Sequence, residues 1–547
     1  MDGRPIIGNE RIDTAERLVS ENPATLEPVG EVCLASDALC ERAVGAAKGA
    51  LPGWRWLAPR EKRAILKRAE NILARRAGET ARLIAMEKGS PYAEALAGEV
   101  YGALQSLNYY AENQGRLLRP KRAGHHTPLF FNKSGTFHFH PLGPTLIISP
   151  WNFPLLIPFC DTLSALTAGN TVVLRPSTAT PFTALLLGEI FVEAGLPPGA
   201  VNVVPCRVPQ VERMIVDPDI HTVMFTGSVG IGKRVMELCS RNLTNLTLEL
   251  GGKDPMLVLE DADLERAARG AVWTAFMNCG QSCGSIERAY VDRRVVREFT
   301  ERVVELAKKI RVGNPLDPDV DMGPMTTAGQ LKVVLEHIED ARAKGARVLC
   351  GGGRVPSLRG HFVEPTVLDR VDHTMKVMTE ETFGPTLPIM PFDSPEEAAA
   401  LANDSLFGLT ASVWTRDRKR AAWFAERLEA GSVTVNDHMY SFIEPRAIWG
   451  GIKQTGMGRS HGPYGLHELV NIKYVGADYF RKKAQTWWFP YDRSLTGLME
   501  KAVTLFHGRS RRARAAAALG LLKEWPRIKA TAPLFNYVLA LPRIFKK

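Results

Sequence analysis

The sequence has no uninterrupted apolar run of the roughly 18 residues that a membrane-spanning helix requires. Its opening stretch, MDGRPIIGNERIDTAERLVS, also lacks the apolar centre of a secretory signal. The 8 cysteines are scattered, with neither paired spacing nor neighbouring histidine ligands. We therefore expect no disulfide framework and no metal site, and we expect a protein of the reducing cytoplasm.

Acidic side chains are scarce in the last part of the chain, where basic ones are many. Residues 481–547 hold 15 Lys and Arg but only three Asp and Glu, a net charge of +12, whereas the whole chain carries +10. The basic character therefore belongs to a C-terminal extension, and the rest of the chain is close to neutral. With 547 residues, of which 45% are apolar and 23% charged, the sequence is typical of a globular protein with two or three domains.

Two short segments hold residue types that are suited to covalent chemistry on a carbonyl. LELGGKDP (248–255) contains Glu249, and FMNCGQSC (276–283) ends with Cys283. A thiolate adds to an aldehyde or ester more readily than water does, and a carboxylate can then activate water against the covalent intermediate. The alternative interpretation is a structural cysteine and an unrelated surface glutamate, because most free cysteines are small core residues.

Five further segments follow in a fixed order. They are SPWNFP (149–154), FTGSVGIGK (225–233), EETFGP (380–385), NDSLFGLTASVWT (403–415) and WGGIKQTGMGRSHGPYGLHEL (449–469). Together with the two segments above, they make the sequence resemble the aldehyde dehydrogenase superfamily from about residue 22 to about residue 475. The stretch RPSTATPFTALLLGEIFVEAGLPPG (175–199) resembles the succinate-semialdehyde and related broad-specificity branch.

The resemblance implies an α/β fold of three parts, which are a Rossmann-like cofactor domain, an α/β catalytic domain and a small β flap for oligomerisation. The expected boundaries are 1–124 and 142–250 for the cofactor domain, 251–448 for the catalytic domain, 125–141 and 466–480 for the flap, 449–465 for a return segment to the cofactor domain, and 481–547 for the extension. The resemblance also implies a homodimer or a homotetramer.

Local patterns agree with alternating helices and strands. Apolar residues at three- and four-residue spacing predict helices within 37–51 and 60–89. Short apolar runs at 145–149 and 170–174 alternate with helical stretches, the pattern of βαβ units and a parallel sheet. Alternating polar and apolar residues at 134–143 predict an edge strand or a hairpin.

The segment FTGSVGIGK is the candidate phosphate-binding turn, because the usual G-x-G-x-x-G fingerprint is absent after any early strand. Its glycines permit close backbone approach, and a helix N-terminus offers N–H groups to phosphate oxygens. A plain strand-to-helix turn is the alternative, and GMGRSHG (456–462) is expected to be a loop. By resemblance, NAD or NADP would bind to Ile148, Pro150, Trp151, Phe225, Thr226, Gly227, Ser228, Gly232, Leu250 and Gly251.

Cofactor choice depends on Arg175, Ser177 and Thr178, which stand where many relatives have K-P-S-E. In the family, the Lys and Glu of that motif bind the adenine ribose, and the carboxylate would repel a 2′-phosphate. Thr178 removes the repulsion, and Arg175 offers a planar cation that suits phosphate. We therefore expect NADP to be accepted as well as NAD, although Arg175 holding only ribose hydroxyls is the alternative.

The resemblance assigns Cys283 as the nucleophile, Glu249 as the general base and Asn152 as the side-chain donor to the oxyanion. Glu381 and Phe383 resemble the positions that hold the nicotinamide ribose, with a helix-end glutamate and a core phenylalanine as the alternatives. The implied reaction oxidises an aliphatic aldehyde or semialdehyde, with long-chain aldehydes as one class. Two other functions remain open: a CoA-acylating dehydrogenase, which commonly lacks the Glu249 base, and a non-catalytic scaffold, which would not need these residues.

Several neighbouring residues have simpler interpretations. Lys253 and Asp254 are interpreted as a turn with a surface ion pair, and Cys279 as a packed thiol beneath the nucleophile loop. A regulatory link between Cys279 and Cys283 is the alternative. Candidate walls of a substrate tunnel, by family position, are Phe153, Trp273, Phe276 and residues 437–447.

The C-terminal extension lies beyond the resemblance. Apolar residues within 494–507 fall on one helical face, and the segment 532–547 is apolar and bounded by prolines. A basic amphipathic segment with Trp and Phe suits peripheral contact with an anionic membrane surface. Packing on the body or on a partner subunit is the alternative. Nucleic-acid binding is not expected, because the aromatic residues do not interleave with the basic ones.

Overall fold

The computed structural model describes residues 1–125, 130, 133–478, 485 and 488–523. Backbone contacts divide the chain into two units, one of residues 1–117 with 140–471 and one of residues 118–139 with 472–547. Within the described residues, no helix is both long enough and apolar enough to cross a membrane. The larger unit holds two large sheets, one two-stranded sheet, and every segment that carries an expected catalytic or cofactor residue.

The first sheet of the larger unit has eight strands. In spatial order they are β19 (Gly456–Met457), β11 (Asn245–Glu249), β10 (Thr222–Thr226), β7 (Thr145–Ile148), β8 (Val172–Arg175), β9 (Val201–Val203), β1 (Ile6–Ile7) and β2 (Glu10–Arg11). The strands from β11 to β9 run parallel, as the sequence predicted, and the outer strands are antiparallel to their neighbours. Strand order reverses between β7 and β10, and ligands of open α/β sheets bind at the carboxyl ends of such strands.

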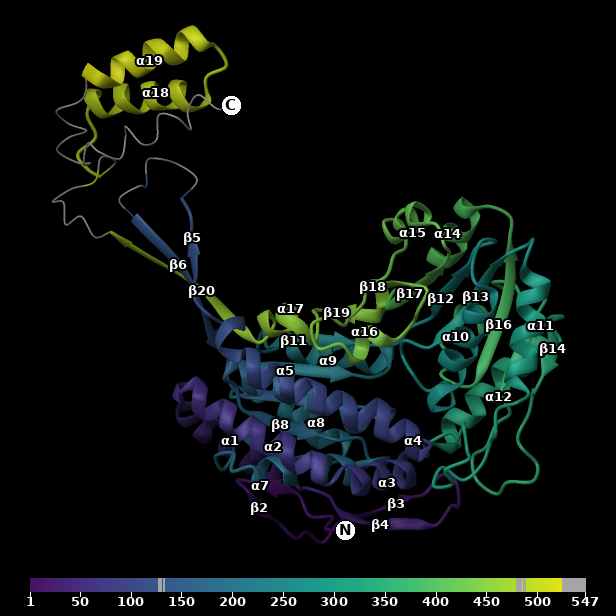
Figure 1. Cartoon of the computed structure of the whole chain (residues 1–547). Coiled ribbons are helices and arrows are strands. Elements are labelled where there is room, and N and C mark those ends of the chain that lie inside the picture. The colour runs from purple at the N-terminus through teal and green to yellow at the C-terminus, as the bar shows by residue number, and fades with distance from the viewer. Residues whose placement is uncertain (126–129, 131–132, 479–484, 486–487, 524–547) are drawn as a thin grey trace. The chain divides into compact units, whose positions relative to one another are not determined.

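Helices cover both faces of this sheet (Figure 1). One face carries α1 (Asp37–Trp56), α8 (Val208–Ile215) and α9 (Val229–Cys239), whose apolar residues share one core with the strands. The other face carries α6 (Leu156–Ala168) and α7 (Pro181–Glu193). Packed on these two are α2 (Pro59–Arg75), α3 (Ala77–Lys88) and α5 (Tyr101–Leu117). The helices predicted near the N-terminus are confirmed, with a break at Arg76 that the periodicity did not reveal.

A short irregular helical stretch joins α3 to α5. Gly89 ends α3 with a φ of 92°, and α4 (Tyr92–Glu94) then leads into a π-helical turn, Ala95–Val100. A π-helical turn widens the helix by one residue and is often found at functional sites. The stretch formed by α4 and this turn places Glu94 and Glu99 next to segments that carry expected site residues.

The second sheet of the larger unit has seven strands. In spatial order they are β14 (Arg347–Cys350), β15 (Thr366–Asp369), β16 (Thr386–Phe392), β13 (Ile286–Asp292), β12 (Asp254–Val258), β17 (Thr410–Trp414) and β18 (Ser432–Val435). All neighbouring pairs are parallel except β14 with β15. The central strands β12 and β13 are buried at every residue, as expected for a parallel sheet that is covered on both faces.

Two groups of helices cover the second sheet (Figure 1). On one face lie α10 (Leu264–Phe276), α11 (Val296–Ala307) and α12 (Ala328–Ala343), and on the other lie α13 (Lys376–Thr379), α14 (Pro395–Asn403) and α15 (Arg418–Ala425). The remaining elements of the unit are the hairpin β3 (Arg17–Glu21) with β4 (Pro28–Cys33), the short helices α16 (Tyr440–Ile443) and α17 (Gly462–His467), and two 3-10 turns, Met277–Gly280 and Lys453–Thr455.

The smaller unit holds a sheet in the order β20 (Val470–Asp478), β6 (Lys133–Pro141) and β5 (Lys121–Ala123). β5 and β6 form an antiparallel hairpin, as predicted. Of the two alternatives for residues 134–143, the hairpin is the one found, and an edge position is not, because β20 pairs with the other side of β6 and makes it the central strand. That partner comes from more than 300 residues later in the chain, so local alternation could not reveal it.

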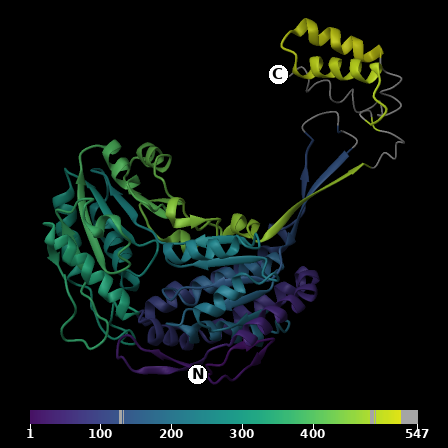
Figure 2. The same cartoon turned by 180° about the vertical axis from the view of Figure 1, so that it is seen from behind.

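The C-terminal extension forms an antiparallel pair of helices, α18 (Arg493–His507) and α19 (Arg511–Lys523), which both views show side by side (Figures 1 and 2). The predicted apolar face of α18 is confirmed in part, since Leu495, Leu498 and Leu505 are buried. The apolar segment predicted at 532–547 lies outside the described residues.

Candidate functional site

One cavity gathers most of the expected site residues of the larger unit. It has a volume of about 230 Å³. Its walls come from the loops that follow β7, β10 and β11, from the loops that precede β13 and β16, and from α12 (Ala328–Ala343). The carboxyl edge of the first sheet and the amino edge of the second sheet thus meet at Cys283. The lining residues are Pro150, Trp151, Asn152, Thr226, Gly227, Ser228, Leu250, Gly251, Cys283, Gln330, Val333, Glu381 and Phe383.

The loop before Cys283 holds an unusual backbone conformation. Asn278, Cys279 and Gly280 have φ values of 51°, 55° and 70°, so two non-glycine residues adopt the left-handed region in succession. Hydrogen bonds hold Asn278 there: its N–H donates to Glu94 Oε2 at 2.9 Å, and its Nδ2 donates to the carbonyl oxygens of Asn152 and Gln281, each at 2.9 Å. Such strain costs of order 1–3 kcal/mol per residue and persists where the surroundings fix it, as they do here.

Cys279 is 1% exposed, and its Sγ lies 3.5 Å from Met325 Sδ. Burial raises the pKa of its thiol. These contacts agree with the interpretation of Cys279 as a packed thiol.

The Cys283 side chain is partly exposed to the cavity. Burial raises the pKa of its thiol, and the nearby carboxylates of Glu381, Asp254 and Glu249 raise it further. The thiol is therefore the resting form at neutral pH, and a base must take its proton before it can act as a nucleophile.

Asn152 is fixed beside the Cys283 loop. It is 3% exposed, and its Nδ2 donates to the Gln281 carbonyl oxygen at 3.1 Å. A primary amide carries two N–H protons, so a second proton remains to donate into the cavity that Asn152 and Cys283 share. The arrangement can therefore stabilise negative charge on an oxygen bound next to the Cys283 sulfur.

Glu249 ends β11 and does not line the cavity. It is 6% exposed, and among the described residues neither of its carboxylate oxygens makes a well-formed hydrogen bond. Burial raises its pKa well above the usual value, and the charge of Asp161 on α6 raises it further, while Arg459 and the Ser460 N–H lower it in part. A carboxylate with a raised pKa and few partners is suited to accept a proton near neutral pH.

The Glu381–Phe383 loop is held by a buried ion pair. Glu287 accepts hydrogen bonds from the N–H groups of Thr382 and Phe383 at 2.8 and 2.9 Å and from Lys253 Nζ at 2.6 Å. Phe383 adopts a φ of 51° and packs edge-on against Trp151, with ring centroids 5.5 Å apart. Glu287 therefore fixes the loop that lines the cavity opposite Trp151.

Glu381 itself faces the backbone of the segment after β11. Its Oε1 accepts from the Gly252 N–H at 2.9 Å. A Cβ added at Gly251 would lie 2.4 Å from Glu381 Oε2, so only glycine allows this approach. Burial is the main cause that raises the pKa of Glu381 to about 8.

The interpretation of Lys253 and Asp254 as a surface ion pair is wrong. Each is 1% exposed, and the two side chains do not pair with each other. Lys253 binds Glu287, whereas Asp254 accepts from the N–H and hydroxyl of Thr410 at 3.1 and 2.7 Å. Lys253 directly precedes β12, whose first residue is Asp254, and the two side chains are held by separate partners.

The turn between β10 and α9 lines the cavity through Thr226, Gly227 and Ser228. Ser228 is the N-cap residue of α9, and its side chain makes no capping hydrogen bond. A Cβ added at Gly230 would meet no atom within 4 Å, so the first turn of α9 faces open space. These features fit an anionic group at the helix N-terminus. Gly232 instead lets α9 pack on Leu250, because a Cβ there would lie 2.5 Å from Leu250 Cδ2.

Six expected cofactor residues do not line the cavity, namely Ile148, Arg175, Ser177, Thr178, Phe225 and Gly232. Ile148 and Phe225 are buried in the first sheet. Arg175 ends β8, where its Nε and Nη2 donate to the Cys206 carbonyl oxygen at 3.3 and 3.1 Å, and burial lowers its pKa. Ser177 and Thr178 follow in the loop before α7, next to this carboxyl end of the sheet.

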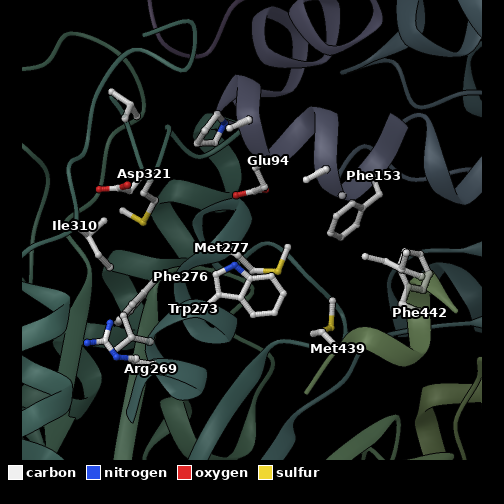
Figure 3. Close-up of a pocket in the computed structure, with 18 of the residues that line it drawn as sticks. Glu94, Phe153, Arg269, Trp273, Phe276, Met277, Ile310, Asp321, Met439 and Phe442 are labelled. Atoms are coloured by element: carbon white, nitrogen blue, oxygen red, sulfur yellow. The ribbon is translucent and has the colours of Figure 1, made fainter. Parts of the chain in front are cut away.

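A second, larger cavity of about 620 Å³ has Phe276 and Met277, of the segment that ends at Cys283, among its walls (Figure 3). Phe153, which lines it, directly follows Asn152. Met439, another wall residue, receives a hydrogen bond from the Ser282 hydroxyl at 3.8 Å. The expected wall residues Phe153, Trp273 and Phe276 and three residues of 437–447 (Met439, Phe442 and Ile443) all line this cavity.

Several neighbours of the site could not be found from the sequence. Asp161, Glu287 and Gly450 each act on an expected residue from a distant segment. The segment 456–462 is also more than the expected loop, because β19 pairs Gly456 with Glu249. The one indication in the sequence is the group of glycines at 450–458, because glycine is common where the backbone approaches another group closely. It does not show which group is approached.

A model of the aldehyde dehydrogenase family matches residues 11–475 of the chain. The NADP-dependent succinate-semialdehyde dehydrogenase of Escherichia coli K12 is 37% identical over 473 residues, which cover 86% of this chain and 96% of that protein. Human retinaldehyde dehydrogenase 3 is 38% identical over 467 residues, 84% of this chain and 90% of that protein. The NAD+ complex of an aldehyde dehydrogenase from Bacillus cereus superimposes with a TM-score of 0.83 at 33% identity, covering 88% of this chain and 97% of that one.

Proposed function

The chain belongs to the aldehyde dehydrogenase family, and from that premise we propose that Cys283, Glu249 and Asn152 carry out the oxidation of an aldehyde to a carboxylate. The protein is an NAD(P)-dependent oxidoreductase that acts on aldehydes. The single observation that supports the residue roles best is the placement of Asn152 and Cys283 in one cavity.

In the first step, a water molecule carries the thiol proton to solvent, which leaves Glu249 unprotonated, and Cys283 Sγ attacks the aldehyde carbon. A carbon–sulfur bond forms, and the carbonyl oxygen becomes an anion. The free N–H of the Asn152 amide and the backbone N–H of Cys283 stabilise that oxygen. The Gln281 carbonyl keeps the amide in place, so the donor needs no reorganisation during the reaction.

Bound NAD or NADP supplies the hydride acceptor, and loss of hydride from the adduct leaves a thioester on Cys283. The Glu249 carboxylate then takes a proton from water, which attacks the thioester carbon. The carbon–sulfur bond breaks, the carboxylate product leaves, and the thiolate is restored. Because Glu249 is present, hydrolysis is favoured over transfer of the acyl group to CoA.

The cofactor would lie across the carboxyl ends of the first sheet. The N-terminus of α9 would receive the pyrophosphate, Glu381 and Phe383 the nicotinamide ribose, and Arg175, Ser177 and Thr178 the adenine ribose. The first sheet would then serve as the cofactor domain and the second as the catalytic domain.

The experiment is to follow absorbance at 340 nm with purified protein, an aldehyde, and NAD or NADP. Cys283→Ala should abolish cofactor reduction. Glu249→Gln should retain a single turnover and accumulate an acyl adduct on Cys283, which intact-mass spectrometry detects. Cysteine-independent reduction would contradict the role of Cys283, and release of acyl-CoA in place of carboxylate would contradict the role of Glu249.

We further propose that two copies of the chain associate through β20. Among the described strands of its sheet, β20 lies at the edge, and Ile472, Tyr474 and Val475 expose 49%, 52% and 43% of their surface. An exposed edge strand with apolar side chains is a template for pairing with another chain. Light scattering should report a dimer or tetramer, and Val475→Lys should shift it to smaller species. A monomeric native protein would contradict this proposal.

We also propose that the C-terminal extension contacts an anionic membrane surface. Trp488, Phe489 and Tyr491 are exposed before α18, and the exposed Arg511 and Arg512 begin α19. The full chain should sediment with vesicles that contain phosphatidylserine, and the binding should weaken with salt and in an Arg511→Glu, Arg512→Glu variant. Equal binding to neutral phosphatidylcholine vesicles, or none to either, would contradict the proposal.

A further inference from the structure

We infer that the aldehyde oxidised by this protein is uncharged and apolar. Its chain or ring system is larger than that of a short semialdehyde, which would not fill the cavity. The inference rests on the proposed function and concerns the larger cavity beside the Cys283 loop. The relatives are named for aldehydes of different charge, among them succinate semialdehyde, betaine aldehyde and retinaldehyde, so similarity alone leaves the substrate class open.

The walls of the larger cavity are mostly apolar and aromatic. Figure 3 shows Phe153, Trp273, Met277, Met439 and Phe442 around one space. They come from separate segments: the turn before α6, the end of α10 with the residue after it, and the α16 region. Flexible methionines beside aromatic rings adapt to apolar ligands of irregular shape.

Among the described wall residues, no cation is without an acidic partner. Arg269 is the one basic residue in the lining, and its Nε lies 2.6 Å from Glu265 Oε1 at the exposed face of α10. Behind the wall, Lys88 Nζ lies 4.7 Å from the Phe153 ring centroid, but it is 1% exposed and bonded to Glu99 at 2.8 Å. A substrate carboxylate would therefore be desolvated without a partner, which is unfavourable.

The two acidic wall residues, Glu94 and Asp321, are also occupied and do not attract a cationic aldehyde. Glu94 accepts from the Ser90 hydroxyl at 2.8 Å and from the Asn278 N–H at 2.9 Å, so it serves the nucleophile loop. Asp321 is bound by Arg311, with Nε 2.9 Å from Oδ2. Both carboxylates already have protein partners, and the lining offers apolar contact rather than charge recognition.

The larger cavity has the size and the position that an extended apolar substrate needs. A volume of about 620 Å³ lies in the range of sites that bury drug-sized ligands. Met439 lines this cavity and also touches the nucleophile loop, because a Cβ on Gly284 would lie 2.8 Å from Met439 Sδ. An extended apolar tail can thus occupy the cavity while its aldehyde carbon lies at the Cys283 loop.

The test compares aldehydes of matched chain length with and without a terminal carboxylate. With the full-length protein and saturating cofactor, kcat/KM should rise about fourfold per added methylene from butanal to octanal, the value expected for burial of one methylene group. Butanal should exceed succinate semialdehyde by at least about tenfold, as expected when a desolvated charge lacks a partner. A higher kcat/KM for succinate semialdehyde than for butanal, or for betaine aldehyde than for octanal, would overturn the inference.

A pair of variants ties the preference to this cavity. Trp273 is 54% exposed on the cavity wall, so Trp273→Arg should fold and should raise the ratio of succinate semialdehyde to butanal at least about tenfold by supplying a cation. Trp56 is 74% exposed on α1, and Trp56→Arg is the matched control that should leave the ratio unchanged. An unchanged ratio in Trp273→Arg would overturn the inference.

The failure of the dehydrogenase assignment is distinguishable from these outcomes. If succinate semialdehyde is oxidised in a Cys283-dependent reaction but butanal and octanal are not, the proposed function stands and the substrate class is wrong. If no aldehyde reduces either cofactor in a Cys283-dependent reaction, the proposed function falls and the substrate class falls with it.

Discussion

Gly450 lies against the carboxylate of Glu249: a Cβ added at Gly450 would come within 2.6 Å of Glu249 Oε1. Gly450 also has a φ of 132°, a conformation that side chains rarely adopt. The position of the proposed base thus depends on a glycine about 200 residues later in the chain. No spacing rule connects the two residues, and only the fold shows that they meet.

The first prediction is that Gly450→Ala displaces the Glu249 carboxylate and slows hydrolysis of the thioester. We expect kcat to fall at least about tenfold, within the range for a displaced general base, while a burst of about one reduced cofactor per site persists. Stopped-flow absorbance at 340 nm measures both phases. Gly345→Ala is the control for backbone strain, because Gly345 has a φ of 97° and no atom near its added Cβ. Loss of the burst together with kcat would contradict this mechanism.

The second prediction concerns pH. Burial raises the pKa of Asp161 on α6 to about 7, and its charge raises the pKa of Glu249. A general base works when deprotonated, so kcat should fall as pH drops through the pKa of Glu249. Asp161→Asn removes the repelling charge and lowers that pKa. The acid limb of the kcat profile should therefore move to lower pH, and a limb that stays in place or moves upward would refute the coupling.

Asp161→Asn should also change the pH dependence of stability. The pKa of Asp161 is higher in the folded protein than in the unfolded chain. The contribution of this group to the unfolding free energy is therefore highest at low pH, where the group is protonated in both states, and it falls as pH rises through the folded pKa. The gain in unfolding free energy from Asp161→Asn should therefore be larger at pH 8.5 than at pH 5.5, by about 2 kcal/mol. Denaturant titrations at the two pH values measure it, and an equal gain at both would count against a raised pKa of Asp161.

The sequence predicted those parts of the molecule whose cause is local. Apolar runs gave β7 and β8, three- and four-residue spacing gave α1 and α2, and long ordered motifs placed Asn152 and Cys283 in one family site. The interactions that tune the site are different, because they join segments from separate sheets. Lys253 looked like a surface residue because its partner, Glu287, belongs to a neighbouring strand. Local periodicity carries no information about such a pair.

The third prediction is that Glu287→Gln loosens the Glu381–Phe383 loop. The change leaves Lys253 buried without a counter-charge and weakens two backbone hydrogen bonds to Thr382 and Phe383. Breaking a buried ion pair typically costs about 3–5 kcal/mol, so thermal unfolding should shift downward. A positioning role further predicts that KM for NAD or NADP rises more than kcat falls. The double variant Glu287→Gln, Lys253→Met should recover part of the lost stability, but its KM for the cofactor should stay raised.

If KM for the cofactor is unchanged in a folded Glu287→Gln protein, the pair stabilises the sheet only and does not position the loop. The exposed pair Lys309–Glu305, with Nζ 2.6 Å from Oε1, provides a control. Glu305→Gln should change unfolding free energy by less than about 1 kcal/mol and leave both kinetic constants unchanged, because surface ion pairs contribute little.

The last prediction concerns the discrimination between NAD and NADP. Thr178 lies in the loop after β8, near the end of the strand where Arg175 donates to the Cys206 carbonyl. Thr178→Glu places a carboxylate where the 2′-phosphate of NADP would lie, and like charges a few ångström apart repel by about 4 kcal/mol at an effective dielectric constant of 20. We expect kcat/KM for NADP to fall at least about tenfold while that for NAD changes little. Thr178→Gln has nearly the same size without the charge, so it should leave the NADP to NAD ratio close to that of the native protein. Two results would contradict this prediction: an equal loss with NAD and NADP in Thr178→Glu, or an equal loss of NADP activity in Thr178→Gln. Either would mean that side-chain size rather than charge at residue 178 affects activity, and that the adenine ribose binds elsewhere.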